Sequence, residues 1–476
     1  ILHALATPND TQYGQQWHYY EATGGLNLPP AWDLSTGSGV VVAVIDTGYR
    51  PHADLAANIV GGYDFINDTT NGNDSSARDS DARDPGDYAT YGQCGLFSSS
   101  HNSSWHGTHV AGTIAAVTNN GSGVAGVAYG AKVQPVRVLG ACGGYTSDIA
   151  DAIVWASGGS VSGAPANPNP ARVINMSLGG SGSCDSTSQN AINSARSRGT
   201  VVVVAAGNSN ANASGFSPAG CSGVIAVAAT NRSGGRASYS NYGSVVAVAA
   251  PGGDTSGGSA NGILSTLNSG STTPGNDSYA YYQGTSMASP HVAGVVALML
   301  SRNPSLTPDQ VASLLKSSAR AFPSTCSQCG AGIVNAYAAV VAAGGGTTNP
   351  PPPPPPPTTV TEVESNNSLS TAQPVSEGST VKGAISSIFD TDYYRVSIAA
   401  GSTLGARLTP PSGANYDLYI YNASGTQVAS STLGTGQVDS TSVKNNGSAT
   451  ATYYVRVRFV SGSNGSSSGA YTLAID

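Results

Sequence analysis

Three side chains that lie far apart in the sequence have the types that acyl-transfer chemistry needs: a serine, a histidine and an aspartate. Ser286 lies in the string GTSMASPHVAG, residues 284–294, which contains the start of a predicted helix. A serine at a helix N-terminus can place its oxygen among backbone N–H groups, which stabilise developing negative charge. Because a serine does not ionise by itself at neutral pH, it also needs a base and a carboxylate that orients the base.

Both partners occur upstream, each beside an element that would position it. Asp46 follows the apolar run 40–45, which predicts a buried strand of a parallel sheet. Asp46 then lies at the carboxyl end of that strand, where active sites of open α/β sheets form. His106 begins the string HGTHVAGTIAA, whose small residues favour a helix. Each residue alone has an ordinary interpretation as a cap or turn residue, but together they predict a catalytic triad.

Four strings, VAVIDTG, HGTHVAGT, VVVAAGN and GTSMASPHVAG, resemble in this order the motifs of the subtilisin-like serine proteases, the subtilases. The resemblance covers residues 1–343, and its Asp, His, Ser order is that of subtilisin rather than of chymotrypsin. It implies that Ser286 attacks the scissile carbonyl, that His106 transfers the proton and that Asp46 orients the imidazole. It also implies that Asn208 donates to the oxyanion together with the backbone N–H of Ser286.

The same resemblance implies where a substrate binds. An exposed segment would pair with an extended substrate strand, and a second segment would complete the pocket for the primary side chain. We expect a roomy pocket that accepts large apolar side chains, because the residues are small and none is acidic. Specificity is then expected to be broad. The residues concerned are Ser177, Leu178, Gly179 and Gly180, with Ala206 and Gly207.

The composition narrows the classes of function. Only 9% of the 476 residues are charged and the formal net charge is −7, which argues against binding to nucleic acid or to an anionic membrane surface. No apolar run approaches the ~20 residues that span a bilayer. The chain begins at Ile1 rather than Met, and the resemblance implies that a signal peptide and an inhibitory prosegment have been removed. We expect a secreted, extracellular monomer that acts on protein and peptide substrates.

Six cysteines, an even number, favour three disulfides formed in an oxidising compartment, and fifteen pairings are possible. The last two cysteines are spaced as CxxC, which also matches a redox motif or half of a zinc site. Because no second CxxC and no histidine cluster accompanies them, zinc is disfavoured. The resemblance to extracellular bacterial subtilases implies the pairs Cys94–Cys142, Cys184–Cys221 and Cys326–Cys329.

A carboxylate-rich stretch between residues 64 and 91 offers hard oxygen ligands of the kind that calcium prefers. The alternative interpretation is a solvated acidic loop that Arg78 and Arg83 partly neutralise. The candidate ligands in this stretch are Asp79, Asp81, Asp84 and Asp87.

A second calcium site is implied by the resemblance alone. Asp10 and Asp54 match carboxylates that bind calcium in many subtilases, and the loop that begins at Val117 would supply Asn120 and carbonyl oxygens. Calcium there would clamp the N-terminal segment and stabilise the folded state.

The chain changes character near residue 344. Residues 344–361 include eight consecutive prolines, which predict a stiff polyproline II spacer of about 3 Å per residue. A docking site for another protein is the alternative interpretation. We therefore expect an α/β peptidase domain at 1–343, with a mostly parallel sheet and helices on both faces. A linker at 344–361 and a second domain at 362–476 would follow it.

The second domain has an all-β pattern. Runs such as YDLYIYN and TYYVRVRFV alternate with a period of two and are separated by Gly, Ser and Asn turns, which predicts a β-sandwich. The strings EVESNNS, DTDYYRV and YDLYIYN resemble the prepeptidase C-terminal domain of secreted bacterial proteases. The opening has Asn366 and Asn367 where that domain usually has Asn and Asp, and this departure argues against a metal-binding role there.

Three functions are compatible with these patterns. The first is a secreted endopeptidase. The second is a ligase or cyclase on the same scaffold, in which an amine rather than water attacks the acyl-enzyme. The third is a binding or adhesion protein whose work is done by the β domain. The presence of Asp46, His106, Ser286 and Asn208 together favours an enzyme over the third.

Overall fold

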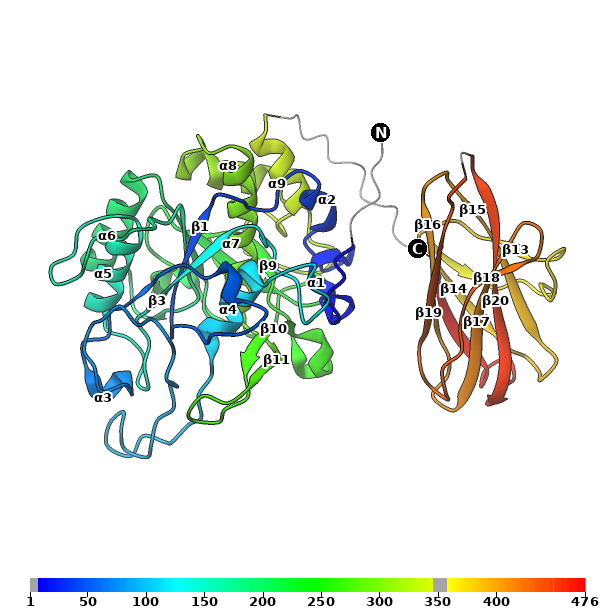
Figure 1. The fold of residues 1–476 in the computed structure, drawn as a ribbon, viewed down its shortest axis with the longest axis horizontal. Coiled ribbons are helices and arrows are strands. Elements are labelled where there is room, and N and C mark those ends of the chain that lie inside the picture. Colours follow the sequence, from blue (N-terminus) through cyan, green and yellow to red (C-terminus); the bar gives the residue numbers. More distant parts are fainter. Residues whose placement is uncertain (1–6, 346–357, 448, 476) are drawn as a thin grey trace. The chain divides into compact units, whose positions relative to one another are not determined.

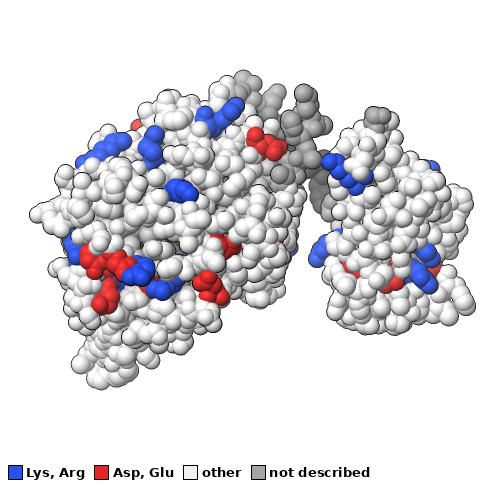
Figure 2. Space-filling model, in the orientation of Figure 1, with Lys and Arg blue, Asp and Glu red and all other residues white. Residues whose placement is uncertain are grey.

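The computed structural model describes residues 7–345, 358–447 and 449–475. Its chain divides into two compact units, one before the proline-rich segment and one after it (Figure 1). Most of the predicted linker, residues 346–357, lies outside the described residues. Figure 2 shows a mostly uncharged surface, as a chain with 9% charged residues requires.

In the part of the chain that the structure describes, the first unit is built on a parallel sheet of seven strands (Figure 1). The strand order is β2-β3-β1-β4-β6-β8-β9, and every pair is parallel. Most positions in these strands are buried, because helices cover both faces of the sheet. The strands are β1 (Val41–Asp46), β2 (Tyr63–Asp64), β3 (Lys132–Arg137), β4 (Val173–Met176), β6 (Val201–Ala205), β8 (Ile225–Thr230) and β9 (Val246–Pro251).

Side chains of β1 alternate between two cores. Val42 and Val44 pack with helices α4, α7, α8 and α9, whereas Ala43 and Ile45 pack with α5 and α6 on the opposite face. This arrangement confirms the predicted α/β fold with helices on both faces. The helices are α4 (His106–Ala115), α5 (Thr146–Ala156), α6 (Ser186–Ser197), α7 (Thr285–Arg302), α8 (Pro308–Ser318) and α9 (Ala336–Ala343).

Short elements complete this unit. They include two antiparallel ribbons, β10-β11 and β5-β7, of which the first packs on α4. Their bounds, with those of three single-turn helices, are α1 (Trp17–Tyr20), α2 (Pro29–Trp32), α3 (Thr69–Gly72), β5 (Gly180–Ser181), β7 (Phe216–Ser217), β10 (Ile263–Asn268) and β11 (Asp277–Tyr282).

The second unit is all-β in its described residues, as predicted. Two five-stranded sheets, ordered β12-β14-β21-β16-β19 and β13-β15-β20-β17-β18, enclose one apolar core. The strands are β12 (Thr358–Thr361), β13 (Gln373–Pro374), β14 (Ser379–Ala384), β15 (Thr391–Ile398), β16 (Thr403–Thr409), β17 (Ala414–Asn422), β18 (Gln427–Ser431), β19 (Asp439–Lys444), β20 (Ala451–Gly462) and β21 (Ala470–Ile475).

All six cysteines belong to the first unit and lie in described residues. They form the three disulfides that the resemblance implies, Cys94–Cys142, Cys184–Cys221 and Cys326–Cys329. Among the described helices, none has both the length and the apolar character that crossing a membrane requires.

Candidate active site

The structure brings Asp46 and His106 into direct contact. Asp46 is the last residue of β1 and is fully buried, while His106 is the first residue of α4. His106 Nδ1 lies 2.8 Å from Asp46 Oδ1 and 3.0 Å from Oδ2. The backbone N–H of Thr47 also donates to Asp46 Oδ1, at 2.7 Å. The carboxylate therefore holds the imidazole by its Nδ1 side, which leaves Nε2 free to act on a nucleophile.

Ser286 occupies the first turn of α7, which begins after Gly284. Gly284 has φ of +152°, a conformation that favours glycine. Ser286 Oγ donates to the carbonyl of Ser177 at 3.1 Å. Within the described chain no hydrogen bond joins Ser286 Oγ to His106, and catalytic hydrogen bonds are often long before substrate binds.

A proline in α7 ties the nucleophile to the segment that follows β4. Pro290 has no N–H, so the carbonyl of Ser286, four residues earlier, lacks its usual helical donor. Ser177 Oγ donates to that carbonyl at 2.7 Å, and Asn175 Nδ2 donates to Ser177 Oγ at 3.0 Å. Ser289 Oγ in turn donates to Asn175 Oδ1 at 2.7 Å. This buried network fixes the start of α7 against the end of β4.

The amide of Asn208 is oriented by its neighbour in the nucleophile motif. Asn208 Oδ1 accepts from both the backbone N–H and the Oγ1 of Thr285, at 2.9 and 2.8 Å. Because these two bonds hold the oxygen toward Thr285, the Nδ2 group on the other side of the amide remains available as a donor. A Cβ added at Gly284 would lie 3.5 Å from this Nδ2 atom and 3.6 Å from the backbone nitrogen of Ser286, so both donors lie near Gly284.

The electrostatic surroundings of His106 favour its charged form. Burial of the imidazole lowers the pKa of His106, but the charge and hydrogen bond of Asp46 outweigh burial, and Asp87 and Asp84 add to the effect. The pKa therefore lies above the ordinary value of 6.5. His106 is mostly neutral, and able to accept a proton, only when the pH is above this raised pKa. An ordinary histidine becomes neutral at a lower pH.

Two of the residues expected to bind substrate contact the start of α7: Ser177 contacts Ser286, and the N–H of Gly207 donates to Thr285 Oγ1 at 3.1 Å. Gly179 and Gly180 are exposed, and β5 pairs with β7 on one side. Leu178 is partly buried against the core. Ala206 is buried, and Gly207 has φ of +104°, where a Cβ would collide with the Asn241 side chain. Glycine is thus required at 207 by both conformation and space.

Comparison with known proteins agrees with this geometry. Residues 37–332 match the model of the subtilase family. The chain belongs to the subtilase family. This match spans the seven-stranded sheet, helices α3 to α8 and all four motifs that carry Asp46, His106, Asn208 and Ser286.

Two curated relatives of this subtilase are bacterial proteases. The "Extracellular protease" of Xanthomonas campestris pv. campestris is 60% identical over 342 residues, which are 71% of this chain and 58% of the relative. The "Extracellular basic protease" of Dichelobacter nodosus is 43% identical over 350 residues, 71% of this chain and 57% of the relative. The chain therefore spans less than two thirds of the length of either relative.

A solved structure also resembles the subtilase chain. The proteases from Pseudoalteromonas arctica PAMC 21717 share 67% identity, with a TM-score of 0.70. The likeness covers 71% of this chain and 100% of the solved chain. At 67% identity this chain resembles the solved protease in sequence as well as in fold.

Sequence reasoning missed the residues that position the candidate catalytic groups of this subtilase. Thr285 donates to Asn208 and Asn175 donates to Ser177, while Ser289 acts one step further away by donating to Asn175. Thr285 and Ser289 lie within the nucleophile motif, and that proximity is a signal that could have found them. Asn175 interrupts an apolar strand, which is a weaker signal because isolated buried polar residues have many roles.

The expected calcium residues near the N-terminus do come together. Asp10 and Asp54 are both buried, and the charge of Asp10 contributes to raising the pKa of Asp54, although burial is the largest cause. Asp10 Oδ1 is buried without a hydrogen-bond partner. Asn120 Nδ2 donates to Asp54 Oδ1 at 2.6 Å, and the N–H of Val117 donates to the Asp54 carbonyl at 2.7 Å. An orphaned buried carboxylate oxygen is a feature that a cation would satisfy.

The four aspartates of the acidic stretch do not form one ligand group in the described structure. Each contacts a different neighbour. Asp79 accepts from the N–H of Asp81, and Asp81 pairs with Arg83. Asp84 is buried and accepts from the N–H of Gly86, while Asp87 accepts from Ser104. Local turns, one ion pair and the bonds from Ser104 account for the contacts of Asp79, Asp81 and Asp87, whereas Asp84 Oδ2 is buried without a hydrogen-bond partner.

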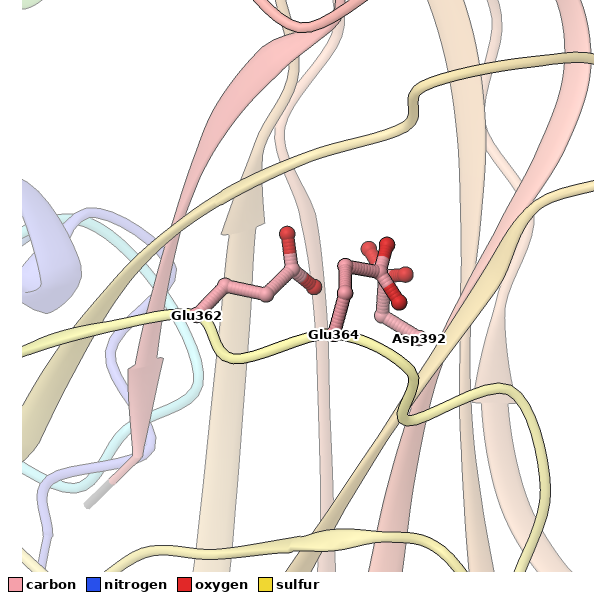
Figure 3. Close-up of side chains that lie close together, drawn as sticks. All are labelled: Glu362, Glu364 and Asp392. Carbon is pink, nitrogen blue, oxygen red and sulfur yellow. The ribbon is translucent and has the colours of Figure 1, made fainter.

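The second unit holds a carboxylate cluster that sequence reasoning had argued against. Among the described residues, only Glu362, Glu364 and Asp392 form a group of three or more His, Cys, Asp or Glu ligand atoms within 4.8 Å of one another (Figure 3). Asp392 is fully buried, and Tyr471 donates to its Oδ2 while its Oδ1 has no partner. The side-chain oxygen of buried Asn366 also lacks a partner. The donor set is therefore one that a calcium ion fits.

Proposed function

We propose that this chain is a secreted serine endopeptidase that hydrolyses proteins through an acyl-enzyme on Ser286. The observation that carries the proposal is the hydrogen bond between His106 and Asp46, formed at the same edge of the sheet at which α7 presents Ser286. His106 Nε2 would take the proton of Ser286 Oγ as the oxygen attacks the scissile carbonyl. It would then donate that proton to the leaving amine, and a water would release the acyl group by the reverse sequence.

Two donors would stabilise the oxyanion. The Nδ2 group of Asn208 is turned away from Thr285, and the backbone N–H of Ser286 belongs to the first turn of α7, where helical N–H groups have no intrahelical partner. Both donors are fixed before the reaction, so they need no reorganisation as charge develops. The substrate strand would lie along Ser177–Gly180, with its primary side chain near Ala206 and Gly207.

The first test is covalent labelling of Ser286 with a fluorophosphonate probe, read beside casein hydrolysis. We expect wild-type protein to be labelled at Ser286 and to hydrolyse casein, and Ser286→Ala to do neither. A folded wild-type protein that is neither labelled nor active would overturn the proposal. Product analysis with an added amine nucleophile separates hydrolysis from peptide ligation.

We also propose that calcium stabilises the folded protein. In the first unit Asp10, Asp54, Asn120 and a carbonyl near Val117 would hold it, supported by the unpartnered buried oxygen of Asp10. In the second unit Glu362, Glu364 and Asp392 would hold a further ion. Bound calcium would supply positive charge that offsets the cost of burying carboxylates. Equal melting temperatures in calcium and in chelator would exclude both sites.

The cellular context is proposed from the relatives and the disulfides. Two relatives are named extracellular proteases, and three disulfides suit an oxidising compartment. We therefore propose secretion, maturation by loss of an inhibitory prosegment, and action as a monomer. We further propose a peptidase domain at 1–343 and a β-sandwich domain joined by a linker, a division supported by the two compact units. The predicted linker, 344–361, extends too far at its end, because β12 (Thr358–Thr361) pairs with β14, and the β-sandwich domain therefore includes Thr358 rather than starting at 362.

A further inference from the structure

A cleft of about 540 Å³ opens beside His106 in the first unit. Its lining includes His106, Ser104 and Ser177, together with both cysteines of the Cys94–Cys142 disulfide. The lining does not include the residues proposed for the primary pocket, Ala206 and Gly207. The cleft is therefore a separate part of the active-site surface.

The position of the cleft indicates which substrate residue it faces. Ser177 begins the segment proposed to pair with the substrate, its carbonyl accepts from Ser286 Oγ, and His106 is the proposed base at the scissile bond. In an extended peptide, successive side chains point to opposite sides. When the primary side chain, P1, enters its pocket near Gly207, the preceding side chain, P2, points away from that pocket and toward His106.

The cleft carries one fixed negative charge. Asp87 is the only Asp, Glu, Lys or Arg in its described lining. The backbone N–H and the Oγ of Ser104 each donate to a different oxygen of Asp87, both at 2.6 Å. These bonds orient the carboxylate but leave lone pairs on both oxygens. Among described residues no Lys, Arg or His forms an ion pair with it.

The negative charge of Asp87 affects two titratable groups near the cleft, His106 and Tyr282. It is one of the causes that raise the pKa of His106, after Asp46, and it contributes to raising the pKa of Tyr282, whose hydroxyl donates to the Ser104 carbonyl. In a chain with only 9% charged residues, an oriented carboxylate without a cationic partner beside the general base is an uncommon feature. A carboxylate of this kind recognises an ammonium or guanidinium group.

We propose that Asp87 determines specificity by binding a Lys or Arg side chain at P2 of the substrate. This inference rests on the proposed endopeptidase function and names a class of substrate for it. Specificity would then be a product of two regions: an uncharged primary pocket that accepts large apolar P1 residues, and an acidic cleft beside His106 that selects P2.

The test uses peptide substrates that are identical except for Ala, Leu, Lys, Arg or Glu at P2. We expect wild-type kcat/KM to be about tenfold higher for Lys or Arg than for Ala, the size of one charge-assisted hydrogen bond at a partly solvated site, and lowest for Glu. The ratio should fall as salt concentration rises. Equal kcat/KM for Lys, Ala and Glu in labelled, active enzyme would overturn the inference.

Variants assign the preference to Asp87. Asp87→Asn can keep one of the two bonds from Ser104 but has no charge, so the Lys-to-Ala ratio should fall toward one, whereas Asp87→Glu should retain part of it. Asp309→Asn removes an exposed carboxylate in α8, outside the cleft lining, and should keep the wild-type ratio. A wild-type ratio in Asp87→Asn would contradict the assignment.

The two proposals fail in different ways. If the wild-type protein is not labelled by fluorophosphonate and cleaves no peptide, the endopeptidase function is wrong. If it is labelled and cleaves every P2 variant at the same rate, only the role of Asp87 is wrong. If Asp87→Asn does not fold, the P2 series and its salt dependence in the wild-type protein still decide the inference.

Discussion

The two units of this chain each bury an aspartate completely, but they satisfy it differently. In the first unit Asp46 receives hydrogen bonds from His106 and from the N–H of Thr47. In the second unit Asp392 receives one bond from Tyr471, while its other oxygen has no partner and Glu362 lies close. Burial and the charge of Glu362 raise the pKa of Asp392 well above its usual range.

This difference shows how the surroundings of a buried carboxylate indicate its role. A buried carboxylate whose oxygens accept hydrogen bonds from a titratable base belongs to a polar network that the chain completes by itself. A carboxylate that is buried among other carboxylates with an unfilled oxygen is incomplete without a proton or a cation. The first therefore points to catalysis and the second to a bound ion. The predictions below test this contrast, beginning with the largest effect.

Replacing Asp46 should affect the reaction far more than the stability. Asp46→Asn is expected to lower kcat by about 10⁴-fold, because the amide favours the wrong imidazole tautomer, as in other serine protease triads. The matched change Asp392→Asn should leave hydrolysis of a small peptide within about twofold of wild type, since it lies in the other unit. Comparable losses of kcat in both variants would contradict the contrast.

Replacing Asn208 should remove one oxyanion donor. Loss of such a donor in a subtilisin lowers kcat by about 10²–10³, and we expect a similar loss for Asn208→Ala with little change in KM. Thr285→Val removes one of the two bonds that orient the Asn208 amide and should have a smaller effect in the same direction. A change in KM alone would mean that Asn208 contributes to ground-state binding.

Calcium should stabilise the second unit through the carboxylate cluster. At a calcium concentration of 100 Kd, binding adds about 2.7 kcal/mol to the free energy of unfolding. Calorimetry of the full chain should show a calcium-dependent transition that Glu364→Gln abolishes. Glu377→Gln, an exposed residue outside the cluster, should preserve it. Because the first unit has its own proposed calcium site, the transition to follow is that of the second unit, and a calcium response of that transition that survives Glu364→Gln would contradict the cluster.

The pH dependence of kcat/KM should report the raised pKa of His106. Protonated imidazole cannot accept the Ser286 proton, so activity should fall as pH drops through a pKa above 6.5. The sign for stability is opposite. A raised pKa means that His106 stabilises the fold below its unfolded pKa, and this contribution is lost as pH rises through the folded value. The profile is measured with a P2-Ala substrate. If kcat/KM falls only below pH 6.5, the effect of Asp46 on the pKa of His106 does not outweigh the effect of burial.

Patterns that are local in sequence predicted most of the architecture. The continuous apolar run before Asp46 predicted a sheet that is covered on both faces. The alternating runs of the second unit predicted a β-sandwich, in which each sheet has one exposed face. Both predictions are confirmed. The acidic stretch stays a predicted metal site, for which the described structure shows no shared group of carboxylates. Asp79, Asp81, Asp84 and Asp87 are close in sequence, yet turns direct them to different neighbours.

The second unit shows the opposite case. The string that opens it departs from the pattern expected of a metal site, but Asp392, which belongs to β15, joins Glu362 and Glu364 from the opening. A motif confined to a few residues does not include a ligand that strand pairing brings from elsewhere in the fold.

The sequence by itself determined the family, the chemical types of the catalytic residues and the order in which they occur, because short motifs and apolar periodicity require no knowledge of distant contacts. Only the tertiary structure decided which of the polar side-chain and backbone atoms have hydrogen-bond partners and which do not. The Asn208 amide is turned by Thr285, the Ser286 carbonyl is taken by Ser177 because Pro290 cannot donate, and Asp87 reaches the cleft beside His106. Hydrogen-bond satisfaction depends on residues that meet only when the strands and helices pack.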